Sequence, residues 1–341
     1  MHDNHKKRTV IVFILLIILV IAGLLINICI GSTGISLSDV LKSVFKGNAD
    51  AKTANIIMNI RIPRTVMTLF LGGALAVSGF LLQTYFANPI AGPYILGISS
   101  GAKMAVAVTL IFIVGSTGYS SGLMLIVSAF VGALLSTGFI ILISYKIKNM
   151  AALLAAGIMV GYICSAITDF LIAFADDSDI VNLHGWSQGS FSGANMNGVR
   201  YSVVVVVIAL VLSMMLSKSL DALRLGETYA KSVGVNVKVC RICIILLSSL
   251  LAACVTAFAG PVSFIGIAVP FLMRQSLKSS KPIILIPASF LAGSVFCMFS
   301  DLLARVMFAP MELNISAVTS LFGAPIVIFM IIRRNKNHGA S

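Results

Sequence analysis

The sequence predicts an all-α, polytopic membrane protein with about ten transmembrane helices in a tightly packed bundle. Of its 341 residues, 59% are hydrophobic and only 10% are charged, and its mean hydropathy is +1.06. Soluble domains are about 45–50% apolar and about 25% charged, so a water-soluble core cannot absorb this much apolar surface. A bilayer can, because each spanning helix takes ~20 apolar residues.

Apolar runs long enough to cross a bilayer occupy most of the chain. The first follows Lys6, Lys7 and Arg8, exceeds the apolar region of a signal peptide and lacks a convincing cleavage site, so we expect a retained span. We expect residues 1–341 to form one transmembrane domain. The predicted spans are 10–30, 65–84, 94–114, 122–144, 151–174, 199–217, 241–259, 262–277, 283–301 and 313–332.

The charge distribution predicts the orientation of these spans. A formal net charge of +13 taken alone suggests nucleic-acid binding. Most of the Lys and Arg, however, fall in the segments that are cytoplasmic if the N-terminus is inside, as the positive-inside rule requires. We therefore expect both termini in the cytoplasm, a multi-pass location in the bacterial cell membrane, contact with lipid, and no nucleic-acid partner.

Small residues and broken connections indicate how the helices pack. Clusters such as Gly72-Gly73-Ala74 let helix backbones approach closely where lipid supplies no hydrophobic drive. The prolines and glycines of Asn88–Pro93 and Gly260-Pro261 predict that the helices are broken at these connections. Irregular backbone at membrane depth survives only where protein or a watery cavity satisfies it, and such interruptions are typical of transporters.

The residues that could support enzyme chemistry are sparse. Cys240-x-x-Cys243 has no second cysteine pair and no nearby histidine, so we interpret both thiols as packing residues and expect no metal site. Asp176, Asp177 and Asp179 form a single acidic cluster, whereas a membrane prenyltransferase needs two. The chain has no Gly-x-x-x-x-Gly-Lys-Ser/Thr motif, so we expect no cofactor and no ATP hydrolysis by the chain itself.

One long hydrophilic segment, residues 218–241, separates the sixth and seventh spans. Its apolar spacing predicts two short helices, broken near Gly226 and ended by Gly234. Helices this short are unstable alone, so they must pack on something. Two alternatives remain: the inner face of the protein itself, or a groove on a cytoplasmic partner.

Lys103 and Asp169 are the ionisable residues deepest in the predicted spans. Either would be costly facing lipid, so each is expected to face the bundle interior or a wet cavity. Lys103 can instead extend its amine toward the surface, and Asp169 can lie near the outer mouth. If both act as coupling groups, the chain is an ion-gradient-driven secondary transporter, which is the rival class.

Arg61 and Arg64 are expected at the outer start of the second span. They lie three residues apart on one helical face, and Pro63 suits a first helical turn. Positive charge there opposes the helix macrodipole at ~0.3–1 kcal/mol and runs against the positive-inside bias. Either an outside partner or lipid phosphate would account for it.

Several short motifs follow one another along the chain. They are Arg61-Ile62-Pro63-Arg64-Thr65, Ser78-Gly79 with Gln83, Asn88-Pro89-Ile90-Ala91, Leu96-Gly97-Ile98-Ser99-Ser100-Gly101-Ala102, Leu225-Gly226-Glu227, Ala230-x-x-Val233-Gly234-Val235, Ala259-Gly260-Pro261, Phe264-Ile265-Gly266, Asp301-Leu302-Leu303-Ala304-Arg305 and Gly323-Ala324-Pro325. Together and in this order they resemble the FecCD-type permeases, the membrane subunits of ABC importers for ferric siderophores, haem and vitamin B12. The resemblance runs from about residue 55 to Arg334. It departs from the family pattern at Pro270-Phe271, usually Pro-His, and at Glu312–Ser316, usually Glu-Leu-Pro-x-Gly.

The resemblance implies roles for particular residues. It implies a coupling loop that binds an ATPase subunit, with Leu225, Gly226, Glu227, Ala230, Val233 and Gly234. It implies that Arg61, Arg64 and Arg305 receive glutamates of a substrate-binding protein. It also implies a translocation path that includes Gln83, with Lys103 and Asp169 as further candidates, and a cytoplasmic gate at Asn149, Met150, Ala151 and Ala152.

The resemblance also implies the partners and the cargo. Two permease chains, as a homodimer or a heterodimer, would form the pore above two ABC ATPase subunits, with an extracytoplasmic binding protein on the outer side. A ferric siderophore is the expected cargo, and haem and cobalamin remain alternatives.

Overall fold

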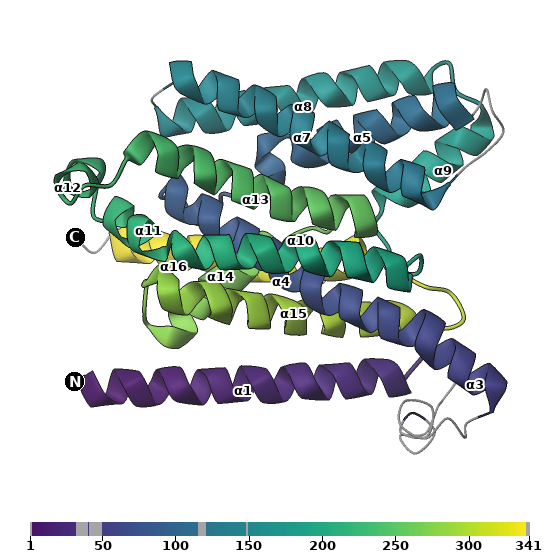
Figure 1. The fold of residues 1–341 in the computed structure, drawn as a ribbon, viewed down its shortest axis with the longest axis horizontal. Helices are drawn as coiled ribbons and strands as arrows, with labels where there is room; N and C mark the ends of the chain where they lie inside the picture. The colour runs from purple at the N-terminus through teal and green to yellow at the C-terminus, as the bar shows by residue number, and fades with distance from the viewer. Residues whose placement is uncertain (1, 32–39, 41–49, 115–120, 148, 339–341) are drawn as a thin grey trace.

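The computed structural model describes residues 2–31, 40, 50–114, 121–147 and 149–338. These residues form helices and no strand, as the sequence predicts (Figure 1). The helices are α1 (His2–Cys29), α3 (Ala51–Ile56), η2 (Ile57–Arg61), α4 (Ile62–Tyr85), η3 (Pro93–Leu96), α5 (Ile98–Val108), η4 (Thr109–Val114), α7 (Gly122–Lys146), α8 (Met150–Ile172), α9 (Asp177–Ser187), α10 (Met196–Met215), α11 (Ser217–Arg224), α12 (Glu227–Ser232), α13 (Val237–Ala259), α14 (Ile265–Leu277), α15 (Pro282–Val306) and α16 (Ile315–His338).

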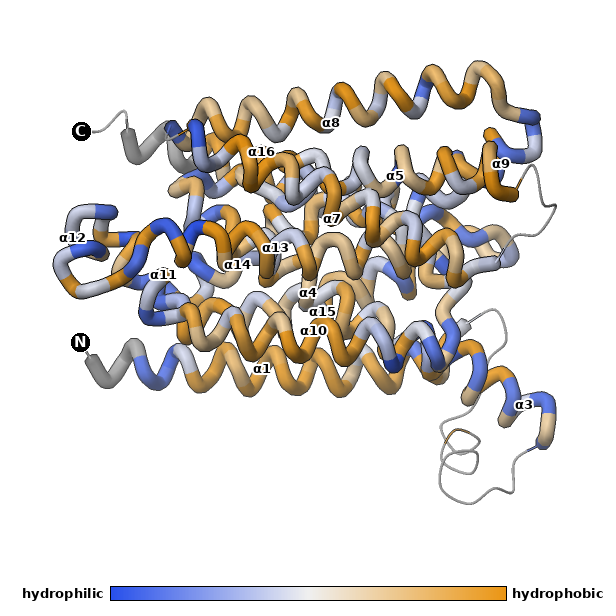
Figure 2. The backbone as a smooth tube through the Cα atoms, turned by 45° about the horizontal axis from the view of Figure 1, so that its top comes forward, coloured by the Kyte–Doolittle hydropathy of each residue, from blue (hydrophilic) through white to orange (hydrophobic). Residues whose placement is uncertain are grey.

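The ten predicted apolar spans correspond to ten apolar helical segments. Eight helices in the described ranges are long and apolar enough to cross a membrane, and two shorter apolar segments, Ile98–Val114 and Ile265–Leu277, complete the set. The long helices lie roughly side by side along the longest axis (Figure 1). Hydrophobic residues fill the middle of the bundle and hydrophilic residues gather at its ends, the pattern expected of a membrane protein (Figure 2).

The two ends of the bundle are distinct. Both chain termini lie at the same end as α11 and α12, whereas α3 and α9 lie at the opposite end (Figure 1). We call the first the loop end and the second the far end. The predicted cytoplasmic side corresponds to the loop end, and that orientation stays a prediction.

The helix α4 forms the centre of the bundle. In its continuous helix Ala51–Tyr85, 83% of the most apolar window is buried, against 6% for the window in α1. Glycines allow this packing: a Cβ at Gly79 would lie 1.7 Å from the Gly266 carbonyl oxygen, and one at Gly72 would lie 2.6 Å from that of Gly293. The small-residue clusters therefore mark backbone contacts of α4 with α14 and α15, as predicted.

A second hydrophobic core joins α5, α7 and α8 to one face of α13. Gly97, with φ +72°, starts α5 against the backbone of Gly161 in α8. The predicted broken connections are also present, because Asn88–Pro93 contains no α-helix and α14 begins only after Phe264, whose φ is +64°. The breaks separate the short helices α5 and α14 from the helices that precede them.

The predicted start of the second span is wrong. The span was expected at 65–84 with Arg61 and Arg64 at its N-terminus, but the helix begins at Ala51 and is continuous to Tyr85. Pro63 lies inside it and cannot donate an amide hydrogen bond. The wider π-helical turn Ile57–Arg61 immediately before it accommodates the proline ring. The two arginines are thus internal to a helix, so their positive charges do not lie at a helix N-terminus and do not oppose its macrodipole.

Candidate functional site

The hydrophilic segment forms the two predicted short helices, α11 and α12. Gly226 separates them with φ +114° and ψ 152°, and Gly234 follows α12 with φ +83°. Nothing lies within 4 Å of a Cβ built at either glycine. The requirement for glycine is therefore conformational rather than steric, because L side chains rarely adopt these backbone angles.

The inner side of this loop packs on the protein itself. Ala230 is fully buried in a small core with Ala222 and Val237. Glu227 forms an ion pair with Arg241 of α13. The two helices are thus fastened to the start of α13, which confirms the alternative that they pack on their own inner face.

Three large apolar side chains of the loop are exposed among its polar residues. Leu225 is 68% exposed, Tyr229 47% and Val233 52%. We call these three residues the loop patch. They lie on a peripheral loop at the loop end (Figure 1). Packing on the protein itself therefore leaves an apolar surface available to a partner.

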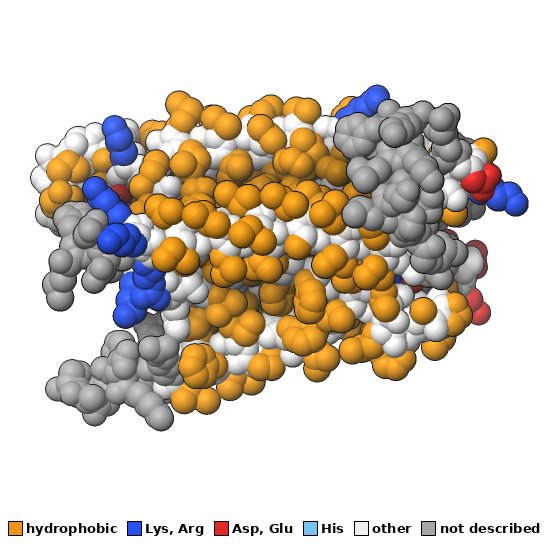
Figure 3. Space-filling view, turned by 90° about the horizontal axis from the view of Figure 1, so that it is seen from below, with side chains coloured by type: hydrophobic (Ala, Val, Ile, Leu, Met, Phe, Trp, Pro, Cys, Tyr) orange, Lys and Arg blue, Asp and Glu red, His pale blue; other side chains and the backbone are white. Residues whose placement is uncertain are grey.

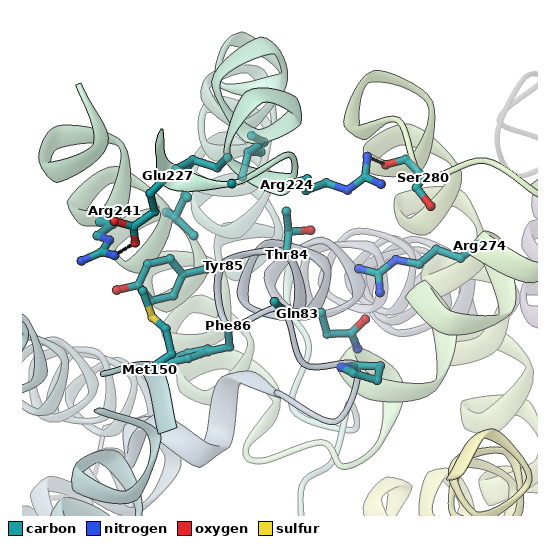
Figure 4. Close-up of a pocket in the computed structure, with 16 residues that line it drawn as sticks. Gln83, Thr84, Tyr85, Phe86, Met150, Arg224, Glu227, Arg241, Arg274 and Ser280 are labelled. Carbon is teal, nitrogen blue, oxygen red and sulfur yellow. Dashed lines mark hydrogen bonds and ion pairs between the residues drawn. The ribbon is translucent and has the colours of Figure 1, made fainter. Parts of the chain in front are cut away.

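A cleft of ≈ 470 Å³ lies behind the loop, between the end of α4 and the helices α11, α13 and α14. Figure 4 shows side chains from these separate elements converging on it, among them Tyr85, Glu227 and Arg274. Arg274 was not predicted as a site residue. Its guanidinium lies 5.4 Å from the centre of the Phe80 ring, a cation–π contact. The only signal for it in the sequence was a charge at the end of an apolar run.

The predicted gate residues lie at the same end. Asn149 caps α8, and its side-chain oxygen accepts from the amides of Ala151 at 2.9 Å and Ala152 at 3.3 Å. Met150 lines the cleft. The cap therefore fixes the start of α8 beside the cleft behind α11 and α12, and gating itself remains a prediction.

The three candidate path residues lie on three different helices, α4, α5 and α8. Gln83 borders the cleft but is only 2% exposed, and its amide nitrogen donates to the carbonyls of Gly266 and Ile267 at 3.3 and 3.1 Å. It ties α4 to α14. Lys103 is half-buried on α5 and Asp169 is exposed on α8. The two form no ion pair with each other in the described part of the chain.

The three predicted docking arginines meet at the far end and are all buried. Their exposures are 4% for Arg61, 7% for Arg64 and 8% for Arg305. Arg64 contacts Asp301 at 2.9 Å and Glu312 at 3.0 Å, and Arg305 contacts Asp301 at 3.2 Å. We call these five residues the arginine cluster. The expectation of arginines displayed at an open rim does not hold in this conformation.

The cluster also holds the end of α1. Arg61 donates to the carbonyls of Ile28 and Cys29 at 2.7 Å each. Arg305 donates to the side-chain oxygen of Asn27 at 2.5 Å. Cations are favourable at a helix C-terminus, so the arginines satisfy α1 carbonyls that would otherwise lack partners. Lipid phosphate is not needed to explain their charge.

No group of three or more His, Cys, Asp or Glu capable of holding a metal ion is found in the described residues.

A comparison with protein families matches the FecCD transport family over residues 15–333. The chain belongs to this family. The match begins earlier than the predicted residue 55 and so includes the first span.

Similar proteins are permeases of several import systems. The chain is 30% identical over 338 residues to the hemin transport system permease protein HmuU of Yersinia pestis, covering 98% of this chain and 99% of that one. It is 31% identical over 341 residues to the Fe(3+)-citrate import system permease protein YfmD of Bacillus subtilis, covering 99% of each. It is 31% identical over 338 residues to the vitamin B12 import system permease protein BtuC of Vibrio vulnificus, covering 99% of this chain and 98% of that one.

Solved structures agree on the fold. An inward-facing conformation of a putative metal-chelate type ABC transporter matches with TM-score 0.83 and 27% identity, covering 95% of this chain and 99% of that one. PsaBC from Streptococcus pneumoniae, in complex with Fab, has TM-score 0.51 and 15% identity over 86% of this chain and 95% of that one, which shows a shared fold. The FecCD family member is thus a multi-pass permease of the bacterial cell membrane.

The arginine cluster predicts coupling between buried charges. Replacing Arg64 by Gln leaves Asp301, 1% exposed, with one cation fewer, and should destabilise the protein by about 3 kcal/mol. Adding Asp301→Asn should recover part of that loss, giving an interaction free energy of roughly 1–3 kcal/mol. Thermal unfolding of the single and double variants in one detergent measures it. Strictly additive losses would contradict a shared ionic cluster.

Proposed function

We propose that this FecCD family member is the membrane permease subunit of an ATP-driven ABC importer for an iron chelate, most favourably a ferric siderophore. Haem and cobalamin are the alternatives, because permeases of hemin, Fe(3+)-citrate and vitamin B12 systems are all about equally similar to it. The observation that carries the proposal is the loop patch: an exposed apolar surface held on α13 at the end that also bears both termini.

The loop patch is the proposed binding site of an ABC ATPase subunit. Leu225 and Val233 present apolar side chains, while Ala230 and the Glu227–Arg241 ion pair fix the loop to α13. A partner that moved the patch would therefore move the start of α13 and the walls of the cleft. Ligand-driven movement requires that the partner bind two conformations with different affinity, which nucleotide binding to the ATPase would supply. The chain itself would use no cofactor.

The arginine cluster is the proposed contact for a substrate-binding protein. Glutamates of that protein would replace Glu312, whose side chain is 45% exposed while that of Arg64 beneath it is only 9% exposed. Arginine suits such an exchange because it binds carboxylates through two parallel hydrogen bonds. Glu312 would thus occupy the docking position until the binding protein arrives.

Two permease chains would form the pore, as a homodimer or a heterodimer, with two ATPase subunits beneath. The path would use Lys103, Asp169 and Gln83, and the α8 start from Asn149 to Ala152 would gate it. Gln83 contributes by holding α4 on α14 rather than by an open surface. Asp169, exposed on α8, is free to face a second chain.

Reconstitution tests the proposal against a secondary transporter. Proteoliposomes should contain the chain and its ATPase, with the binding protein added on the opposite side of the membrane. They should accumulate radiolabelled ferric siderophore only when ATP is supplied on the side where the ATPase is bound. Parallel assays with haem and cobalamin assign the cargo. Uptake by the chain alone under an ion gradient would overturn the ABC assignment in favour of the secondary transporter.

The loop patch predicts a charge-sensitive ATPase contact. Leu225→Asp or Val233→Asp should weaken binding of the purified ATPase subunit about tenfold or more, because each places a charge in an apolar contact. Both side chains are exposed in the free chain, so folding should be unaffected. Biolayer interferometry on nanodisc-embedded protein measures the affinity.

Met311→Asp is the matched control for this prediction, since Met311 is 72% exposed on the connection between α15 and α16 at the far end. It should leave ATPase affinity unchanged. Equal weakening by all three variants would indicate a general charge effect and argue against the patch.

Replacement of Glu312 is expected to raise the affinity of the chain for the substrate-binding protein. Glu312→Gln removes the carboxylate that competes for Arg64 and should strengthen docking of the co-purifying binding protein by a few-fold, more strongly at low salt. Met311→Gln, a neighbouring change without loss of charge, serves as control. Surface plasmon resonance at two salt concentrations measures both. Weaker docking of Glu312→Gln would mean that Glu312 itself contacts the binding protein.

A further inference from the structure

The helix α1 is attached to the bundle by hydrogen bonds near its two ends and by Leu16, 5% exposed, in its middle. At the loop end, Arg8 donates to the carbonyls of Ser276 at 2.5 Å and Gln275 at 3.3 Å, the last turn of α14. Toward the far end, a Cβ at Gly23 would lie 3.0 Å from the terminal carbon of Met298, and Asn27 donates to the Met298 carbonyl at 3.3 Å.

Between these attachments α1 separates from α14 and α15 and leaves a groove of ≈ 250 Å³. Only apolar side chains line it. Figure 3 shows hydrophobic side chains covering most of the face seen from below, the side on which α1 lies in Figure 1. The helices α1 and α15 are long and apolar enough to cross a membrane, and α14 is one of the two shorter apolar segments. Its lining includes Leu16, Leu272, Met273, Val295, Phe296 and Phe299.

Hydrocarbon is the medium at this depth, and it determines what can fill the groove. Water would find no polar partner there, and an empty groove would forfeit the dispersion contacts of its lining. A cavity of about 150 Å³ already holds a benzene molecule. A lipid acyl chain is the apolar rod that the surrounding bilayer supplies.

The basic end of the groove indicates the headgroup. Met273 lies three residues before Ser276, whose carbonyl binds Arg8, so the groove ends about one helical turn from that contact. Lys6 and Lys7 precede Arg8 and are exposed, as is Lys278 just beyond α14. Figure 3 shows Lys and Arg side chains gathered at one end of this face. Such clusters beside a span attract anionic lipid.

We propose that the groove between α1 and the α14–α15 pair binds one acyl chain of an anionic phospholipid, whose headgroup lies against the basic residues at the start of α1. The lipid would add to the apolar packing that Leu16 and Gly23 already provide for α1. This site does not depend on the transported cargo or on an ATPase.

Tryptophan fluorescence tests the site, because Trp186 is the only tryptophan of the chain. In a Trp186→Phe background, Phe299→Trp places a fluorophore at the groove, where Phe299 is 55% exposed. At equal mole fraction, phosphatidylglycerol brominated on its acyl chains should quench the fluorescence of this tryptophan at least about twice as strongly as brominated phosphatidylcholine. The excess should saturate at low mole fraction.

Ile21→Trp in the same background is the matched control. Ile21 is 53% exposed and five residues from Leu16, so it points about 140° away from the groove at a similar depth. Its quenching should follow the bulk mole fraction, with nearly equal effects of the two lipids. Adding Lys6→Gln and Lys7→Gln to Phe299→Trp should remove the preference for phosphatidylglycerol, while Arg8 keeps α1 attached.

Equal quenching of the Phe299→Trp variant by the two lipids would overturn the anionic site. So would the same phosphatidylglycerol preference at Ile21→Trp, because that would show enrichment over the whole surface. Loss of preference on removing Lys6 and Lys7, with phosphatidylcholine quenching unchanged, would support it.

Discussion

Close backbone contact between α4 and its neighbours is the constraint on which the rest of the structure depends. In a bilayer, apolar side chains gain little by leaving lipid, so helix association relies on dispersion and on buried polar contacts. Gly79 against Gly266 provides the first, and the bond of Ser78 to the Ser248 carbonyl at 2.7 Å provides the second. Because α13 holds the loop of α11 and α12 and α15 contributes to the arginine cluster, α4 connects the two ends of the bundle.

The two ends have opposite mechanical character. At the far end, Arg64, Asp301 and Arg305 are buried together and joined by short ionic contacts. At the loop end, α12 has one fully buried side chain, Ala230, and a cleft behind it. Segments with little buried apolar contact open most readily. Movement is therefore easier at the loop end, and the far end serves as the fixed reference.

The sequence predicted the features that depend on local pattern and failed on those that depend on distant partners. Long apolar runs were sufficient to predict the spans. The spacing of apolar residues, together with Gly226 and Gly234, was sufficient to predict the two loop helices. The start of the second span was misplaced because polar residues such as Asn59 lower the hydropathy of a stretch that is nevertheless helical. The burial of Arg64 was invisible because its partners, Asp301 and Glu312, lie 237 and 248 residues away in sequence. Proximity of that kind is created only by the packing of α4 on α15.

The arginine cluster determines how the end of α1 is held at the far end. Arg61 and Arg305 hold the last turn of α1 through the Ile28 and Cys29 carbonyls and the Asn27 side chain. A carboxylate that approached these arginines from outside would compete with those contacts as well as with Glu312. Docking would then loosen α1 at the far end, while Arg8 still held it at the loop end. The apolar packing of Leu16 in the main core and of Gly23 against Met298 would remain, so the change would be confined to the last turn of α1.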